Sequence, residues 1–453
     1  MKNTEFLNLM GDIDIELIEK AEHPKRKRYA GKIWVSAIAA CLAVAVAFGA
    51  VLGGTPVGIS EKDGYAIVRA VYGEDVDEAP FYDYYYDGID EFYKNMLVEM
   101  FEKNGGENAV YSPASLYMSL AMLAEMTDGE SRAQILALLG ADDIKETRAI
   151  AQRIWNACYR AENENKMLIA NSVWLNERFD EYLKPQTLGT VAEYHYTSSF
   201  SGNFEDEAYT EAIKSWINEQ TENLLEDSVG NLDFDPETVF SLISTVYFKD
   251  IWENKFSEGE TKPMTFYTSA NEAVKCDYLC QEAIYLIYEG ENFTAILKEF
   301  ESGGDMLFVL PERGHTPEEL LHDEEFLEFF VYPYEKNFAS ENIAVRIPKF
   351  DISSEKDMVE TMRNLGVTHI FNADASNFTP LAKDLDIFLN RFDHSVRVSI
   401  DENGCVGAGY TAIDGVCGVD PRLMKFDRPF LFSVFTEEGT PLFAGLINNP
   451  AKN

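Results

Sequence analysis

The sequence contains a few patterns that resemble cofactor or metal sites, but the surrounding residues do not support such a role. Gly407-Ala408-Gly409-Tyr410-Thr411-Ala412 follows a predicted strand and matches the G-x-G-x-x-A pattern of dinucleotide-binding folds. The residues after it include Gly415 and Gly418, so no helix follows whose N-terminus could hold a pyrophosphate. Cys276 and Cys280 are not spaced as a C-x-x-C pair, and none of the 6 His residues stands at metal-ligand spacing from another His or a Cys. The sequence therefore predicts no metal site and no cofactor.

Other reaction classes are excluded in the same way. The chain has no G-x-S-x-G nucleophile elbow, no P-loop and no H-E-x-x-H zinc motif. Its 78 Asp and Glu against 38 Lys and Arg give a net charge of −40, which disfavours nucleic acid as a partner because phosphates are neutralised by basic side chains. We therefore expect no catalytic residue, and the protein is predicted not to be an enzyme.

The informative stretch is residues 394–450. An alternating strand (Val396, Val398, Ile400) is followed by a long run of small and flexible residues, and an apolar strand pair ends the chain. One interpretation is a hairpin that turns at Asn403-Gly404 with an exposed loop. However, loops longer than about 12–15 residues are usually functional. Small side chains would let such a loop insert between existing strands, so the pattern favours strand insertion.

The elements that position this loop belong to a large domain, residues 89–453. Apolar residues recur at helical spacing over 89–100, Ser112-Pro113 is typical of a helix start, and a further helix is expected over 131–139, ended by Gly140. Later segments have strand character: 167–175, 240–248, 306–311, 343–352, 396–400 and 430–435. Helices first and strands later predict an α+β fold with large, mostly antiparallel sheets.

The N-terminal residues predict a membrane anchor. Residues 33–52 carry no charge and would span about 30 Å as a helix, the thickness of a bilayer core. The basic residues before them predict a cytoplasmic tail at 1–32. A cleaved signal peptide, with Ala45-Val46-Ala47 as processing site, is the alternative. Residues 53–88 are expected to be an acidic, Tyr-rich linker with a short strand near Tyr65–Val71.

Several motifs in residues 89–453 resemble the serpins, a family of serine protease inhibitors. The C-terminal segments Phe426–Phe432, Pro441–Gly445 and Asn449-Pro450 are similar to the family's last strands, and Asn108–Leu116 is similar to its second helix. Three central segments also match: Asn171–Trp174, Val246–Lys249 with Trp252, and Val345–Phe350.

The resemblance implies a suicide-substrate mechanism with no catalytic residue in the inhibitor. A target serine protease would attack an exposed reactive loop, form a covalent 1:1 acyl-enzyme, and be trapped when the loop inserts into the central sheet. Carried over onto this chain, the hinge is Glu402, Asn403, Gly404 and Cys405. Loop length places the reactive bond at Gly418–Val419, and a small slippage would place it at Cys417–Gly418 or Val416–Cys417. These small apolar residues suit elastase-like or subtilisin-like proteases.

Two further regions follow from the resemblance. The shutter, where the central sheet parts, would be formed by Ser112, Ser115, Ser244 and His394, with Ser244 at a position where the family usually has Asn. Trp252 would mark the breach, where insertion begins.

Val406 and Tyr410 depart from the family's loop pattern, which leaves a non-inhibitory serpin-fold binding protein as the alternative function. The anchor implies a membrane-anchored protein with an extracellular serpin domain, on a bacterial cell surface.

Overall fold

The computed structural model describes residues 65–70, 89–102, 105–160, 165–230, 232–405 and 421–452. The predicted membrane segment 33–52 lies outside these ranges. Within them, no helix is both long and apolar enough to cross a bilayer. The α-helices are α4 Ile89–Phe101, α5 Pro113–Met126, α6 Gly129–Leu138, α7 Ile144–Cys158, α8 Pro185–Tyr194, α9 Glu207–Gln220, α10 Glu226–Gly230, α11 Pro317–Leu320, α12 Glu324–Val331 and α13 Val359–Asn364.

The strands confirm the predicted α+β class. They are β1 Ala66–Val68, β2 Ala109–Tyr111, β3 Lys166–Asn176, β4 Thr197–Gly202, β5 Phe240–Ile251, β6 Lys262–Tyr267, β7 Ala273–Glu289, β8 Phe293–Glu299, β9 Asp305–Pro311, β10 Ala339–Pro348, β11 Phe350–Asp357, β12 Asp393–Ile400, β13 Gly404–Cys405, β14 Arg422–Lys425, β15 Phe430–Phe435 and β16 Pro441–Ile447. Short 3₁₀ turns lie at Glu177–Tyr182, Glu258–Glu260, Pro333–Glu335 and His369–Phe371.

The larger sheet is mostly antiparallel. Its order is β14-β10-β7-β8-β9-β15-β16-β2, with β6 paired to β7. Only β10 and β14 run parallel among the described strands of this sheet. Every residue of β15 and β16 is buried, because both strands carry apolar side chains on both faces.

The second sheet has the order β1-β4-β3-β5-β13, and β11 and β12 form a separate two-stranded ladder. β3 and β4 are parallel, whereas β3 and β5 are antiparallel. β1 comes from the segment predicted as a linker and pairs with the outer edge of β4. Within residues 232–405 no backbone ladder joins β5 to β12. The chain after β12 pairs with β5 through β13, and the boundary between β5 and β12 is here called the seam.

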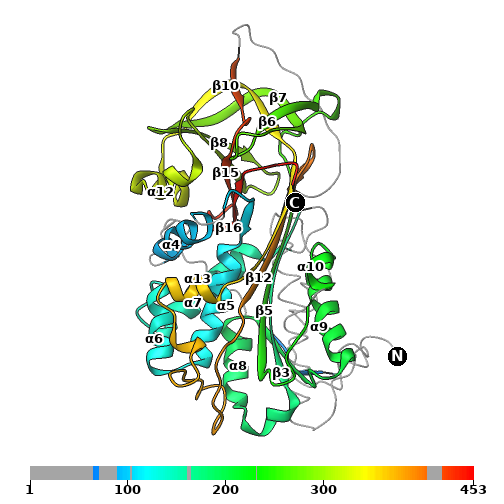
Figure 1. Ribbon diagram of the computed structural model, residues 1–453, viewed down its shortest axis with the longest axis vertical. Coiled ribbons are helices and arrows are strands. Elements are labelled where there is room, and N and C mark those ends of the chain that lie inside the picture. Colours follow the sequence, from blue (N-terminus) through cyan, green and yellow to red (C-terminus); the bar gives the residue numbers. More distant parts are fainter. Residues whose placement is uncertain are drawn as a thin grey trace, which may run out of the picture. The chain divides into compact units, whose positions relative to one another are not determined.

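Helices lie on both sides of the sheet that contains β3 and β5. Figure 1 shows α9 and α10 on one side and α5 to α8 gathered on the other. All residues of α5 are buried, which is typical of a helix in the centre of a core. The expected start of α5 is confirmed, because the Ser112 side chain accepts a hydrogen bond from the Ser115 amide and Pro113 occupies the first turn.

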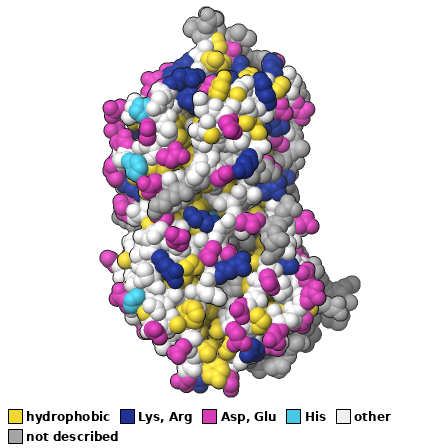
Figure 2. Space-filling model, viewed as in Figure 1, with side chains coloured by type: hydrophobic (Ala, Val, Ile, Leu, Met, Phe, Trp, Pro, Cys, Tyr) yellow, Lys and Arg dark blue, Asp and Glu magenta, His cyan; other side chains and the backbone are white. Residues whose placement is uncertain are grey.

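The surface reflects the composition. Figure 2 shows Asp and Glu side chains spread over the displayed face, with Lys and Arg between them. With a net charge of −40 in the whole chain, this distribution favours solubility and repels other acidic surfaces.

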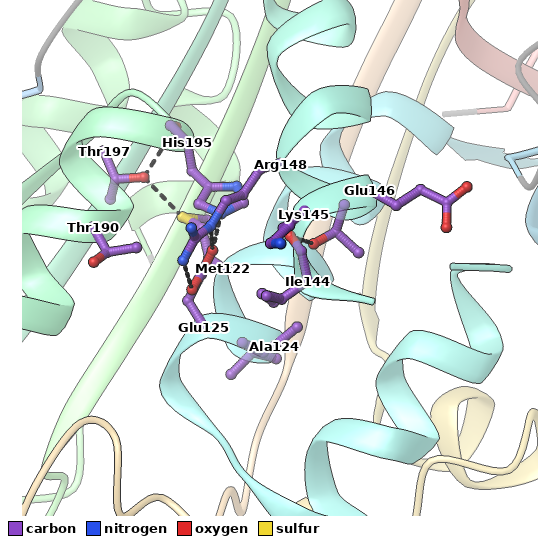
Figure 3. A network of polar contacts seen from close by, with 12 residues as sticks. Met122, Ala124, Glu125, Ile144, Lys145, Glu146, Arg148, Thr190, His195 and Thr197 are labelled. Atoms are coloured by element: carbon purple, nitrogen blue, oxygen red, sulfur yellow. Dashed lines mark hydrogen bonds and ion pairs between the residues drawn. The ribbon is translucent and has the colours of Figure 1, made fainter. Parts of the chain in front are cut away.

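A buried polar cluster fixes the C-terminal end of α5. Glu125 accepts two hydrogen bonds from Arg148 of α7, from Nε at 2.5 Å and from Nη2 at 2.9 Å, and lies 3.2 Å from His195 Nε2 after α8 (Figure 3). Burial opposes ionisation of Glu125, but the hydrogen bonds from Arg148 and His195 outweigh it and lower the carboxyl pKa. Burial lowers the pKa of His195, so the neutral ring donates to the carboxylate.

The substitution Glu125→Gln should destabilise the protein by about 2–3 kcal/mol at pH 7, because it leaves a partly buried guanidinium without its counter-charge. The folded pKa of Glu125 lies below the ordinary 4.5, so its contribution is present above that pH and is lost as pH falls. Urea unfolding at pH 7 and pH 3.5 measures both effects. Glu130→Gln, an exposed change on α6, is the matched control. Equal stability of the two variants at pH 7 would contradict the expected role.

Candidate functional site: the hinge and the strand seam

The predicted hinge forms the start of an additional strand. β13 pairs antiparallel with β5, with Gly404 opposite Ile251 and Cys405 opposite Asp250. The chain reverses after β12, where the Asp401 carboxylate accepts hydrogen bonds from the amides of Asn403 at 2.7 Å and Gly404 at 3.1 Å. This local reversal is an Asx-type turn, which Asp favours.

Gly404 is required by this close approach. A Cβ atom at this position would lie 2.0 Å from the carbonyl oxygen of Asp250, closer than any side chain can come to backbone. Cys405 follows with its side chain buried, and burial raises the thiol pKa well above its ordinary value. The thiol is therefore neutral and unreactive in this arrangement.

Glu402 ties the hinge to two other elements. Its carboxylate lies 2.7 Å from Lys349 Nζ and 2.7 Å from Thr261 Oγ1, and its backbone oxygen accepts from the Phe256 amide at 2.9 Å. Burial opposes ionisation, but the hydrogen bonds from Lys349 and Thr261 lower the carboxyl pKa. The ion pair therefore holds the hinge in place while Glu402 is charged.

Trp252, the predicted breach residue, contacts the hinge directly. Its backbone amide donates to Asn403 O at 2.8 Å, and its indole Nε1 donates to Asp401 O at 3.0 Å. The fully buried ring stacks on Phe300 with centroids 4.7 Å apart. Stacking fixes the ring, so the indole donor is held at the turn that leads into the hinge.

The four predicted shutter residues come together at the N-terminus of α5. The Ser112 amide donates to His394 Nε2 of β12 at 3.0 Å, and Ser115 Oγ donates to the backbone oxygen of Ser244 on β5 at 3.3 Å. Ser244 takes part through its carbonyl, whereas its hydroxyl is buried without a partner in the described part of the chain. The helix start thus contacts both sides of the seam.

His394 must be neutral to accept from Ser112. Burial and the nearby Lys356 lower its pKa to about 3, so Nε2 keeps its lone pair at physiological pH. With Nε2 as acceptor, the ring proton is assigned to Nδ1. The seam is therefore closed by a neutral hydrogen bond rather than by a charge.

Gly418, Val419, Val416 and Cys417, the candidate reactive-bond residues, lie outside the described residues. The residues that sequence reasoning missed are Lys349, Thr261, Phe256 and Asp401. Lys349 stands within a segment quoted for the resemblance, but its pairing with Glu402 has no signal in local sequence. In the described ranges no cluster of His, Cys, Asp and Glu could hold a metal ion.

Comparisons with known proteins agree on one family. Residues 87–450 match the family model described as Serpin (serine protease inhibitor). The chain is 25% identical over 373 residues to alpha-1-antitrypsin of Sus scrofa, covering 80% of this chain and 86% of that protein. Neuroserpin of Mus musculus is 26% identical over 378 residues, covering 80% of this chain and 91% of that protein.

Solved structures show the same fold. The native state of the thermophilic serpin tengpin matches with a TM-score of 0.73 at 23% identity, covering 85% of this chain and all (100%) of that one. Human thyroxine-binding globulin matches with a TM-score of 0.70 at 20% identity, covering 80% of this chain and 99% of that one.

The substitution His394→Gln should flatten the acid dependence of stability. The unfolded chain binds a proton near the ordinary His pKa of 6.5, whereas the folded chain does so only near 3. The contribution of His394 is therefore complete above pH 6.5 and is lost as pH falls, by about 1.4 kcal/mol per pH unit. Urea unfolding of both proteins between pH 7 and pH 4 measures the difference, and the exposed change His322→Gln is the control. Parallel pH profiles of wild type and His394→Gln would exclude this role.

Proposed function

The chain belongs to the serpin family, and on that premise we propose that it inhibits serine proteases by trapping them as covalent acyl-enzymes. In this proposal the protein is a suicide substrate rather than an enzyme. Its partner is a target protease, bound one to one.

The pairing of the hinge with β5 carries this proposal. β13 runs antiparallel to β5 and stops at Cys405, opposite Asp250. A chain that continued in the same direction would next lie opposite Lys249, on an edge of β5 that has no ladder with β12 in residues 232–405. The hinge therefore supplies the first two residues of a strand that the loop could extend.

The proposed reaction balances with the groups of the two proteins alone. The serine Oγ of the protease attacks the carbonyl carbon of Gly418 and the peptide bond to Val419 breaks. The hydroxyl proton of the serine passes to the Val419 nitrogen, which leaves as an amine. The ester remains between the protease serine and the Gly418 carbonyl. Residues 406–418 then extend β13 along β5 and carry the protease with them, before water can hydrolyse the ester. The energy comes from the added strand pairing.

The reactive bond determines the class of target. Gly418 and the alternatives Val416 and Cys417 are small or medium apolar residues, which fit a shallow apolar specificity pocket. They offer no cation to a trypsin-like pocket. We therefore propose elastase-like or subtilisin-like serine proteases as targets.

A serpin-fold binding protein that does not inhibit is the second candidate. The likeness to human thyroxine-binding globulin, a protein named for a ligand, shows that this fold occurs in a binder. In this chain, the bulky Tyr410 and the departure at Val406 favour slow insertion. A binding protein would gain little thermal stability when its loop is cut, whereas a trapping inhibitor would gain much.

We further propose that the protein is anchored in a membrane through residues 33–52, with the serpin domain outside a bacterial cell. The support is the uncharged run of these residues and the Lys and Arg residues before it. Fractionation of cells that express the full chain, followed by protease treatment of intact cells, tests both the anchor and its orientation.

Incubation of the full chain with an elastase and with a subtilisin should give a boiling-resistant band at the summed mass on a denaturing gel. A released peptide that starts at Val419 should accompany it. Gly418→Arg should accelerate trapping of trypsin by about 100-fold or more, because it supplies the cation that the trypsin pocket binds. The matched control Val416→Arg should leave the rate of trypsin trapping unchanged if the reactive bond is Gly418–Val419. An acceleration by Val416→Arg would instead place the bond at Val416–Cys417. Complete cleavage with every protease still active would overturn trapping and favour the binding protein.

The substitution Cys405→Arg separates cleavage from insertion. Cys405 is 2% exposed beside β5, and a buried unpaired guanidinium there would oppose strand extension. The variant should be cut at the same bond and at a similar rate, but should release active protease. Cys405→Ser, which is small and uncharged, should trap normally. Trapping by the Arg variant at the wild-type level would contradict insertion past Cys405.

A further inference from the structure

Lys298 of β8 is a buried lysine whose amine lies against the ring of Trp252, the breach residue. Its side chain is 4% exposed. Three aromatic rings surround the amine, with ring centroids 5.8 Å away for Trp252, 4.7 Å for Phe256 and 5.4 Å for Tyr285. Burial of a lysine amine costs free energy unless the amine is hydrogen-bonded or paired with a charge. The contacts that Lys298 makes are therefore informative.

The polar contacts of Lys298 all lead to the segment 252–256, here called the breach strip. The amine donates to the backbone oxygen of Asn254 and, at 2.9 Å, to Gln281 Oε1 of β7. Gln281 in turn donates to the backbone oxygen of Lys255 at 2.8 Å, and Tyr285 donates to Gln281 Oε1. Lys298 and Gln281 therefore hold the breach strip from behind.

The other side of the breach strip holds the hinge. The amides of Trp252 and Phe256 donate to the backbone oxygens of Asn403 and Glu402, at 2.8 Å and 2.9 Å. The same two residues contribute rings to the cage around Lys298. Any movement of the strip that releases the hinge must therefore disturb the cage.

We propose that Lys298 is a positioning residue for the hinge: its cage stays closed while the breach strip holds residues 402 and 403, and the cage opens when the strip releases them. The consequence for protease trapping rests on the proposed function. The coupling between cage and strip does not, since it follows from contacts within the described residues.

The direction of the pH effect follows from burial. Burial lowers the pKa of Lys298 to about 7 from 10.5, although Glu299 and Glu253 partly offset it. In an opened, hydrated cage the pKa returns toward 10.5. Between these two values opening binds one proton, so it becomes about tenfold easier for each unit that pH falls. Below pH 7 the amine is charged in both states and the dependence ends.

Glu253 and Glu299 are the carboxylates that interact with Lys298, and Asp305 of β9 interacts in turn with Glu299. The Lys255 side chain of the strip pairs with Glu301, and the Tyr285 ring of β7 lies against the amine of Lys298. A hydrogen bond with Glu253, together with burial, raises the pKa of Glu299 to about 7, and burial raises that of Asp305. Opening would lower both values and release protons, an effect of opposite sign confined to pH below about 7. Burial raises the pKa of Tyr285, whose phenol stays mostly protonated up to pH 9.5 in either state. The interval from pH 7.5 to 9.5 therefore lies above the carboxyl range and below the phenol range, and the Lys298 variants isolate the contribution of the amine within it.

Amide hydrogen exchange of the breach strip in the full chain tests the proposal. The opening constant for the Trp252 and Phe256 amides, corrected for intrinsic exchange, should fall about tenfold per unit between pH 7.5 and 9.5 in the wild type. Lys298→Met has a similar length without the amine, and its opening constant should be independent of pH in this interval. Lys298→Gln keeps a donor without titrating and should be equally flat, which covers the case in which the Met variant folds poorly. The exposed change Lys383→Met should behave as the wild type.

Two outcomes overturn the proposal. One is a wild-type opening constant that does not change with pH, and the other is a pH slope that survives in both Lys298 variants. Where the chain traps a protease, the rate at which warming destroys trapping capacity should follow the same pH profile in the wild type and lose it in Lys298→Met. A chain that traps no protease contradicts the proposed function alone, because the exchange experiment still decides the role of Lys298.

Discussion

Among the described residues, the edge of β5 opposite β3 pairs only with β13, and the hinge and the seam both follow from this. A strand edge inside a protein needs partners for its N–H and C=O groups, because unsatisfied backbone groups are costly once water is excluded. On one side β5 has the full ladder with β3, and on the other, among the described residues, it has only the two residues of β13. The carbonyl of Ser244 on this strand receives its hydrogen bond from the Ser115 side chain instead. The seam is thus held by side-chain hydrogen bonds, whereas an inserted strand would satisfy more of the backbone groups along β5.

The α5 helix connects this seam to the helical layer. Its first turn carries Ser112 and Ser115, which contact β12 and β5, and its last turn carries Glu125, which binds Arg148 and His195. A helix that is buried along its whole length has little room to shift, because protein interiors are closely packed. The cluster around Glu125 holds the end of this helix that lies opposite the seam.

The sequence predicted those parts of the site whose signals are local or shared with the family. Ser112-Pro113 predicts the start of α5, and the alternation of apolar and polar residues, together with short apolar runs, predicts the strands. The resemblance then brought together Gly404, Trp252 and His394, which are far apart in the chain. What could not be predicted was which atoms meet: Ser244 contributes its carbonyl rather than its hydroxyl, and Glu402 pairs with Lys349 and Thr261. Such partners depend on strand register and packing, which a single sequence does not encode in any short pattern. Lys298 is the clearest example, because its position in the apolar strand 293–299 does not predict that three aromatic rings surround its amine.

The buried titratable groups show how proton binding is linked to the closed arrangement of the hinge and the seam. His394 and Lys298 are bases that lose affinity for protons when buried, so both lie nearer to their neutral forms than they would in water. Glu402 and Glu125 are carboxylates whose partners favour the charged form. Protonation of any of these four groups works against the closed arrangement, since it charges a buried base or removes the charge from a bound acid. The closed state thus holds fewer protons at these four positions than an open one. At these four groups the linkage has a single sign, so each of them makes opening easier as pH falls, whereas Glu299 and Asp305 beside the cage act in the opposite sense below about pH 7.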